Sequence, residues 1–161
     1  TIKKFLAYVQ SDAGQDIVRR SGFVSQNLIT VRYDAPVEGS RQYRELVQEA
    51  ERLSVNLRFA EDSAELDNKA RRDMLRIADY MRRAENQNKR LVLVGFGDEI
   101  QNRQRAYVLS RLRATSVKSA LFRLGIPSEP VIGLGADVPV ASNAQEGRIK
   151  KRRVEIWVKN P

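Results

Sequence analysis

The stretch from Leu91 to Leu124 constrains the fold more than any other part of the chain. It opens with four consecutive apolar residues, Leu91–Val94, which is typical of a strand that is covered on both faces. Two glycines end this strand, and Asp98 follows directly. A long helix comes next, and one of its faces carries small and apolar side chains at helical spacing: Ser110, Ala114, Val117, Leu121 and Leu124. The stretch therefore predicts a buried strand followed by a helix that can lie close on the sheet.

Asp98 and Arg113 are the candidate binding residues of this stretch. At ~1.5 Å rise per residue, Arg113 lies well over 10 Å into the helix, so the two side chains can meet only if the helix starts beyond the sheet and runs back across it. They would then suit a zwitterion, because a carboxylate accepts hydrogen bonds from an ammonium group and a guanidinium donates a pair of hydrogen bonds to a carboxylate. From spacing alone, a structural ion pair or two unrelated surface charges are the alternatives.

The motif from Gly95 to Leu121 resembles the core of OmpA-like peptidoglycan-binding domains, the family of the C-terminal domains of OmpA, Pal and MotB. Its first part matches at Gly95 and Asp98. Its second part matches at five positions: Leu109, Ser110, Arg113, Ala114 and Val117. The resemblance implies that Asp98 and Arg113 hold the meso-diaminopimelate of a peptidoglycan stem peptide.

Further blocks of the family match in order, so the resemblance spans residues 53–159. Residues 59–66 resemble F-x-x-N-S-A-E-L, with Asp62 in place of the Asn that helps to line the family's pocket. Residues 133–139 and 147–155 resemble two later blocks, and Arg153 lies in the second of them. The resemblance thus implies four peptidoglycan-binding residues: Asp98, Arg113, Asp62 and Arg153, the last supporting the site from the final strand.

The chain departs from the family pattern near this pocket. The differing positions are Asp62, Phe96, Gly97, Ala106 and Lys151, and the loop after Asp98 carries two extra arginines. Two functions therefore stay open. One is non-catalytic peptidoglycan binding that anchors a periplasmic or outer-membrane protein to the cell wall. The other is an OmpA-like scaffold or protein-interaction domain that has lost wall binding.

The periodicity together with this resemblance predicts an α+β fold. We expect a two-layer OmpA-like domain over residues 53–161, in which a mixed sheet of about four strands carries two long helices on one face. Residues 53–59 alternate between apolar and polar, as in a half-buried strand. Asp67 is placed to cap the next helix. The predicted inner stripe of that helix is Ala70, Met74, Ile77, Ala78 and Met81.

A helical segment, residues 1–24, precedes this domain, and residues 25–52 are expected to form a linker and a helix that packs on either neighbour. Ser11 is the predicted N-cap of the second helix in the first segment. This segment resembles the last helices of phosphate-type periplasmic solute-binding proteins at Phe5, Ser11, Gly14, Gln15, Ile17, Val18, Gly22, Phe23 and Val24. The resemblance implies an upstream solute-binding-like module in a longer protein, since the two lobes that would hold a solute are not in this chain.

Composition narrows the chemistry. The chain has no Cys and no His, which excludes thiol nucleophiles, disulfides, zinc sites built on those residues and imidazole triads. We therefore expect no catalytic residues, no metal site and no cofactor. The net charge is +9, and residues 53–161 carry most of the excess. Because the arginines are scattered and few aromatic residues are available to stack on bases, we expect a solvated basic face and no specific nucleic-acid partner.

No run of about 18 apolar residues exists that could span a membrane, and no signal peptide is visible. Because the chain begins with Thr1, we interpret it as a processed chain or a fragment. The family resemblance implies a periplasmic location, with association with the outer membrane as a further option. The oligomeric state is left open.

Overall fold

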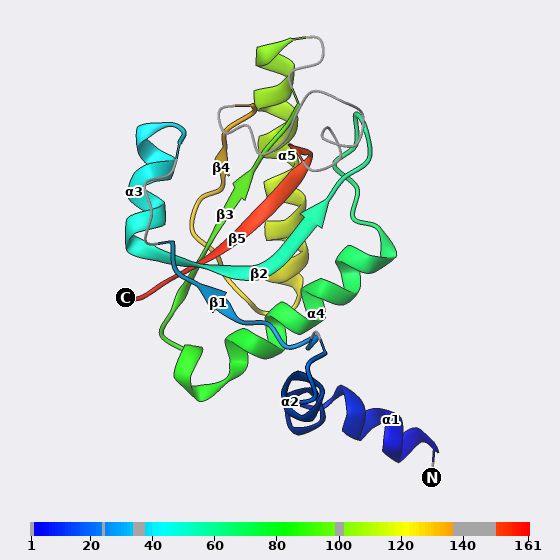
Figure 1. Cartoon of the computed structure of the whole chain (residues 1–161). Helices are drawn as coiled ribbons and strands as arrows, with labels where there is room; N and C mark the ends of the chain where they lie inside the picture. Colours follow the sequence, from blue (N-terminus) through cyan, green and yellow to red (C-terminus); the bar gives the residue numbers. More distant parts are fainter. Residues whose placement is uncertain (1, 24, 34–37, 99–101, 137–150) are drawn as a thin grey trace.

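The buried run Leu91–Val94 lies inside a five-stranded sheet in the computed structural model of the protein, which describes residues 2–23, 25–33, 38–98, 102–136 and 151–161 (Figure 1). The first two helices are α1 (Ile2–Gln10) and α2 (Asp12–Arg20). The remaining elements are β1 (Thr30–Val31), α3 (Arg41–Glu49), β2 (Ala50–Arg58), α4 (Asn68–Arg82), a short 3-10 turn (Ala84–Asn86), β3 (Arg90–Gly95), α5 (Arg103–Arg123), β4 (Ile132–Gly133) and β5 (Arg153–Lys159).

The strand order among the described residues is β1-β2-β5-β3-β4. β5 lies in the middle and is antiparallel to both neighbours, for example with Leu93 opposite Ile156, whereas β3 and β4 are parallel. The predicted mixed sheet is therefore confirmed. It contains five strands rather than about four because two-residue strands, β1 and β4, complete its edges.

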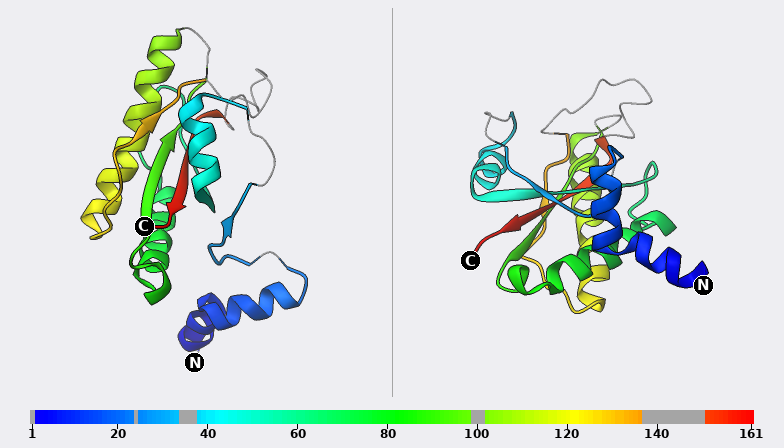
Figure 2. Two further views of the ribbon diagram at one scale, coloured as in Figure 1. Left: turned by 90° about the vertical axis from the view of Figure 1, so that its left-hand side faces the viewer. Right: turned by 60° about the horizontal axis from the view of Figure 1, so that its bottom comes forward.

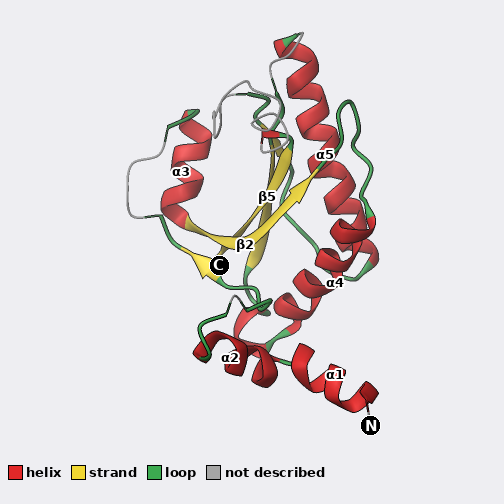
Figure 3. Cartoon of the chain, turned by 45° about the vertical axis from the view of Figure 1, so that its right-hand side comes forward, coloured by secondary structure: helices red, strands yellow, loops and turns green. Residues whose placement is uncertain are grey.

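The two long helices, α4 and α5, cover one face of this sheet, as predicted (Figure 3). Alternate residues of β2, β3 and β5 point toward them, and the predicted stripe of α4 from Ala70 to Met81 is buried against the same face. Asp67 caps α4 as expected, since its Oδ1 accepts a hydrogen bond from Ala70 N at 2.7 Å. The core thus lies between this helical layer and the sheet.

Close backbone contact sets the position of α5 on the sheet. A Cβ atom added to Gly95 at the end of β3 would lie 1.9 Å from the carbonyl oxygen of Ser110, and one added to Gly97 would lie 3.0 Å from that of Ala106. Position 95 therefore requires glycine, and position 97 leaves only tight space for a side chain. Since later residues of β3 meet earlier residues of α5, the helix runs back across the sheet.

α3 covers the opposite face of the sheet (Figure 2). Its Tyr43 ring packs edge-on against Phe96 and Trp157, with ring centroids 5.6 and 5.9 Å apart. The strand that follows starts at Ala50, three residues before the predicted start at Leu53. The described part of residues 25–52 thus contributes β1 and the first three residues of β2 to the sheet, and α3 to its cover.

A buried carboxylate, Glu155, joins α3 to the sheet. Tyr43 Oη donates a hydrogen bond to Glu155 Oε2 at 3.0 Å, and Trp157 Nε1 donates to the same oxygen at 3.2 Å. Arg153 Nε donates to Glu155 Oε1 at 2.9 Å, and Arg52 lies 3.4 Å from that oxygen. Burial and the charge of Glu155 raise the pKa of Tyr43, so this hydroxyl stays a donor.

α1 and α2 form a hairpin that stands beside the α+β domain (Figure 1). Ser11 caps α2 as predicted, because its Oγ accepts a hydrogen bond from Gly14 N. The apolar side chains of α1 are exposed, at 76 % for Ile2 and 66 % for Phe5. The described part of this segment therefore presents apolar side chains to solvent. None of the described helices combines the length and apolar character needed to cross a membrane.

Replacing Tyr43 with Phe should lower the free energy of unfolding by about 2 kcal/mol, because a buried carboxylate loses a hydrogen-bond donor. Tyr33→Phe is the matched control. Tyr33 also packs against Trp157, but among the described residues its exposed hydroxyl bonds only Arg52, so its loss should cost about 0.5 kcal/mol or less. Urea unfolding measures both variants, and equal losses would contradict a structural role for the Glu155 cluster.

Candidate functional site

A small pocket lies where the loop after β2, the end of β3 and the first turns of α5 meet. It is lined by Glu61, Asp62, Gly97, Asp98, Asn102, Arg105, Ala106, Leu109 and Arg113. Its volume is about 30 Å³, which suits one water-sized group. The structure therefore brings three of the sequence-predicted residues, Asp98, Arg113 and Asp62, into one pocket.

α5 starts beyond the sheet and runs back across it, which is the arrangement that Asp98 and Arg113 need in order to meet. The helix begins beyond the end of β3, where Asn102 caps it by accepting hydrogen bonds from Gln104 N at 2.8 Å and Arg105 N at 3.4 Å. From there it returns over Gly97 and Gly95. Arg113, three turns into α5, therefore lies next to the segment after β3, which carries Phe96 and Asp98.

Arg113 is fully buried and ties three backbone segments together. Its Nε donates to the carbonyl oxygen of Ser63 at 2.8 Å, its Nη2 to that of Ala60 at 3.1 Å and its Nη1 to that of Phe96 at 3.4 Å. Burial lowers the pKa of Arg113 to about 10, against the opposing effect of Asp98 and Asp62, so the guanidinium stays charged at neutral pH. These bonds use three of its five N–H groups. Within the part of the chain that the structure describes, one N–H on each terminal nitrogen is left for a ligand.

Asp98 is mostly buried and is held by Arg152, which sequence reasoning missed. The Nη1 atom of Arg152 lies 3.2 Å from Asp98 Oδ2 and 3.7 Å from a carboxylate oxygen of Glu61. The second oxygen of Asp98, Oδ1, has no hydrogen-bond partner among the described residues. Asp98 thus offers one carboxylate oxygen to a ligand, while Arg152 fixes the other.

Arg153, the fourth sequence-predicted residue, is not brought to this pocket. It pairs with Glu155 and lies over the Phe96 ring, 3.9 Å from its centroid, on the face covered by α3. Consecutive strand residues point to opposite faces, so Arg152 and Arg153 separate. This separation was predictable from the sequence. Val154, Ile156 and Val158 alternate toward α4 and α5, and Arg152 falls on the same side of the strand as these residues, whereas Arg153 falls on the other.

Asp62 lies on the exposed rim of the pocket, where it forms an ion pair with Arg105 at 3.1 Å. Its backbone is left-handed, with φ 49°, a conformation that Asp and Asn adopt more readily than most residues. Two of the other departures have structural explanations. Phe96 packs in the cluster beneath α3, and Gly97 lies in close contact with the backbone of α5 at Ala106.

Arg113→Lys should lower the free energy of unfolding by about 2–4 kcal/mol, because the charge stays buried while the forked bonds to backbone carbonyls are lost. Arg105→Lys is the matched control on the same helix. Its ion pair is exposed and its loss should cost about 0.5 kcal/mol at most. Denaturant titration of both proteins tests this, and an Arg113→Lys variant as stable as the control would refute the role given to Arg113.

Comparisons with known proteins identify the family of the chain. The profile of the OmpA family matches residues 58–153. A comparison with curated protein sequences gives no match. The resemblance of residues 1–24 to solute-binding proteins lies outside the family match and stays a prediction.

Three solved structures illustrate the similarity. The peptidoglycan-associated lipoprotein from Burkholderia pseudomallei aligns with a TM-score of 0.57 at 20 % identity, over 65 % of this chain and 89 % of that one. A putative MotB-like protein from Desulfovibrio vulgaris aligns over the whole of both chains, with a TM-score of 0.62 at 19 % identity. The cell wall anchor of the T6SS from Pseudomonas aeruginosa aligns over 91 % of this chain and 94 % of that one, with a TM-score of 0.55 at 25 % identity. At such identities the first two show the fold, and because the family profile covers more than half of the chain, the protein belongs to the OmpA family.

Proposed function

We propose that the protein binds peptidoglycan without catalysis, through the diaminopimelate of the stem peptide, and so anchors a periplasmic or outer-membrane protein to the cell wall. The observation that carries this proposal is the presence of Asp98 and Arg113 in one pocket, each with hydrogen-bonding capacity left over among the described residues. The similarity to two solved structures, a peptidoglycan-associated lipoprotein and a cell wall anchor, supports it.

The proposed binding mode uses both ends of a zwitterion. The ammonium of the diaminopimelate side chain binds Asp98 Oδ1, and its carboxylate accepts the two remaining N–H groups of Arg113. Arg152 keeps Asp98 in place through the other carboxylate oxygen. Because the enclosed volume is water-sized, the two charged groups of the ligand lie at the mouth of the pocket, and the rest of the stem peptide stays at the rim near Asp62 and Arg105.

Asp98→Asn should reduce binding to diaminopimelate-containing sacculi about tenfold, because the ligand ammonium loses a charged partner at a cost of roughly 1–3 kcal/mol. Lysine-type sacculi should also bind less well, since lysine lacks the side-chain carboxylate that Arg113 would bind. Co-sedimentation of the purified protein with sacculi measures both effects. Asp16→Asn on the exposed surface of α2 is the matched control and should bind like the wild type.

Two outcomes would contradict the proposal. If Asp98→Asn and the wild type sediment equally, charge alone explains the binding. If the wild type does not sediment at all, the function is that of an OmpA-like scaffold or protein-interaction domain that has lost wall binding. Unfolding curves of each variant separate a loss of binding from a loss of structure.

We further propose that residues 1–24 pack against a solute-binding-like module upstream in the full-length protein. The exposed apolar face of α1, with Ile2, Phe5 and Leu6, supports this, because water-exposed clusters of this kind mark interaction sites. All three side chains are more than half exposed, so they contribute little to the packing of the described part of the α+β domain.

Phe5→Ser should therefore change the free energy of unfolding of the present chain by about 0.5 kcal/mol or less. In the full-length protein it should lower the melting temperature of the upstream module. Calorimetry of both proteins makes the comparison, and an unchanged upstream transition would contradict the proposal.

A further inference from the structure

A second and larger cavity separates the α1–α2 hairpin from the outer side of α4. Its volume is about 560 Å³, within the range of sites for small ligands. We call it the α4 cleft. It is lined by Gln10, Ser11, Gln15, Gln26, Asn27, Leu28, Arg72, Leu75, Arg76, Asp79, Tyr80 and Arg83. None of these residues lines the pocket of Asp98 and Arg113, so the cleft is a separate site.

Three guanidinium groups follow one wall of the α4 cleft. Arg72, Arg76 and Arg83 are four and seven residues apart, which places them on one side of α4 and its end, in a row roughly 16 Å long. Arg72 is exposed and forms no ion pair with any described residue, whereas Arg76 shares the buried carboxylate of Asp73 at 2.9 Å. The single carboxylate among the described residues that line the cleft, Asp79, lies 3.3 Å from Arg82. The wall therefore favours an anion.

The other wall presents side-chain amides. Those of Gln10, Gln26 and Asn27 form no hydrogen bond with a described residue, so each can both donate to and accept from a hydroxyl group. Part of the floor is apolar, with Leu28 and Tyr80 almost fully buried. Arginines on one side and amides on the other, above an apolar floor, match a ligand that carries both negative charge and hydroxyl groups.

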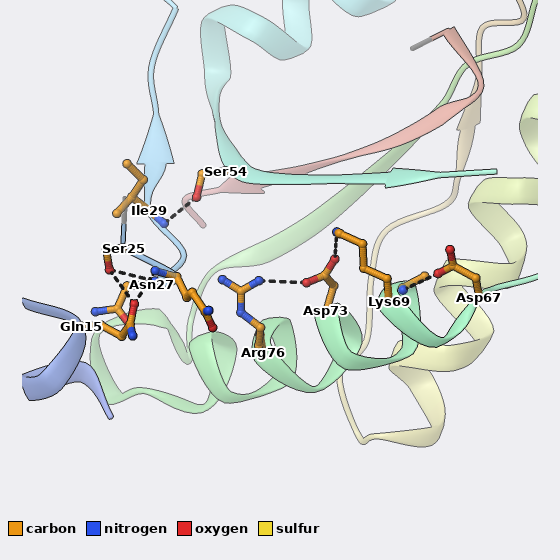
Figure 4. Close-up of polar contacts among 11 residues, drawn as sticks. Gln15, Ser25, Asn27, Ile29, Ser54, Asp67, Lys69, Asp73 and Arg76 are labelled. Carbon is orange, nitrogen blue, oxygen red and sulfur yellow. Dashed lines mark hydrogen bonds and ion pairs between the residues drawn. The ribbon is translucent and has the colours of Figure 1, made fainter. Parts of the chain in front are cut away.

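The hairpin wall is held in place by hydrogen bonds (Figure 4). Gln15 is only 4 % exposed, and its Oε1 accepts hydrogen bonds from the backbone N of Gln26 and from Ser25 Oγ. Ile29 then exchanges hydrogen bonds with Ser54 of β2, through Ser54 Oγ at 3.0 Å and Ser54 N at 2.8 Å. Loop residues 25–29 thus connect the hairpin to the sheet, and both walls of the cleft have defined positions.

From these observations we propose that the α4 cleft binds an anionic saccharide, a short run of hexose units that bear carboxylate or phosphate groups. The guanidiniums of Arg72 and Arg76 bind the anionic groups, and the amides of Gln10, Gln26 and Asn27 bind the hydroxyl groups. This goes beyond diaminopimelate recognition, because the ligand is a sugar chain rather than a stem peptide. Two sources share the chemistry: glycan strands freed of their peptides, whose lactyl groups end in carboxylates, and phosphorylated oligosaccharides.

The test is direct binding of two probes, peptide-free glycan strands made by amidase digestion of sacculi and a phosphorylated core oligosaccharide. Arg72→Gln should weaken the binding of the preferred probe about five- to tenfold. Arg71→Gln is the matched control, with the same charge change at the neighbouring, exposed position of α4 outside the cleft, and should bind like the wild type. Asn27→Ala, made as a separate variant, should also weaken binding of this probe, although it leaves the net charge unchanged.

The probe that binds more tightly identifies the source of the saccharide. Binding of neither probe would overturn the proposal, as would equal losses in Arg71→Gln and Arg72→Gln, which would indicate general attraction to a basic helix. Inorganic polyphosphate binding as tightly as either saccharide, with no effect of Asn27→Ala, would exclude sugar recognition. Because the glycan strands carry no stem peptide, these results are independent of the pocket at Asp98 and Arg113.

Discussion

The buried guanidinium of Arg113 is the interaction on which the rest of the candidate site depends. A charged group without contact to water costs several kcal/mol unless it is hydrogen-bonded, and Arg113 meets this requirement with the carbonyls of Ala60, Ser63 and Phe96. Those carbonyls belong to the loop after β2 and to the end of β3, the segments that also carry Asp62 and Asp98. One side chain therefore holds the walls of the pocket and contributes to its chemistry.

The helix that carries Arg113 reaches this position because two glycines let it approach the sheet. Gly95 leaves no room for a Cβ atom beneath Ser110, and Gly97 leaves little room beneath Ala106. The contact at Gly97 is made with backbone atoms of Ala106, so it does not depend on which side chain position 106 carries. The close approach also explains why the beginning of α5, with its Asn102 cap, extends beyond the sheet and forms part of the pocket.

The sheet gives its two faces different chemistry. On one face Arg152 holds Asp98 at the edge of the pocket, and on the other Arg153 satisfies the buried Glu155 beneath α3. Adjacent arginines therefore have separate roles, one at the site and one in stability. A further group of arginines, Arg72, Arg76 and Arg83, lines the α4 cleft on the outer side of α4.

Much of the fold was predictable from local patterns. The apolar run of β3, the alternation in β2 and the stripe of α4 each depend on the period of one element, and the spacing of Asp98 and Arg113 depends on the length of one helix. The sequence by itself therefore determined the order and the period of these elements. The placement of both helices on one face and the pairing of Asp98 with Arg113 came from the family resemblance, because spacing alone left a structural ion pair or two unrelated charges open.

Only the tertiary structure decided the contacts between elements that are distant in the sequence. The face covered by α3, the choice of Arg152 over Arg153 and the carbonyl partners of Arg113 all depend on strand register and on how loops pack. The α4 cleft likewise exists only because loop 25–29 holds the hairpin opposite α4. The physical reason is that a periodic pattern specifies which side of an element is apolar, whereas the partner of a polar side chain depends on three-dimensional proximity.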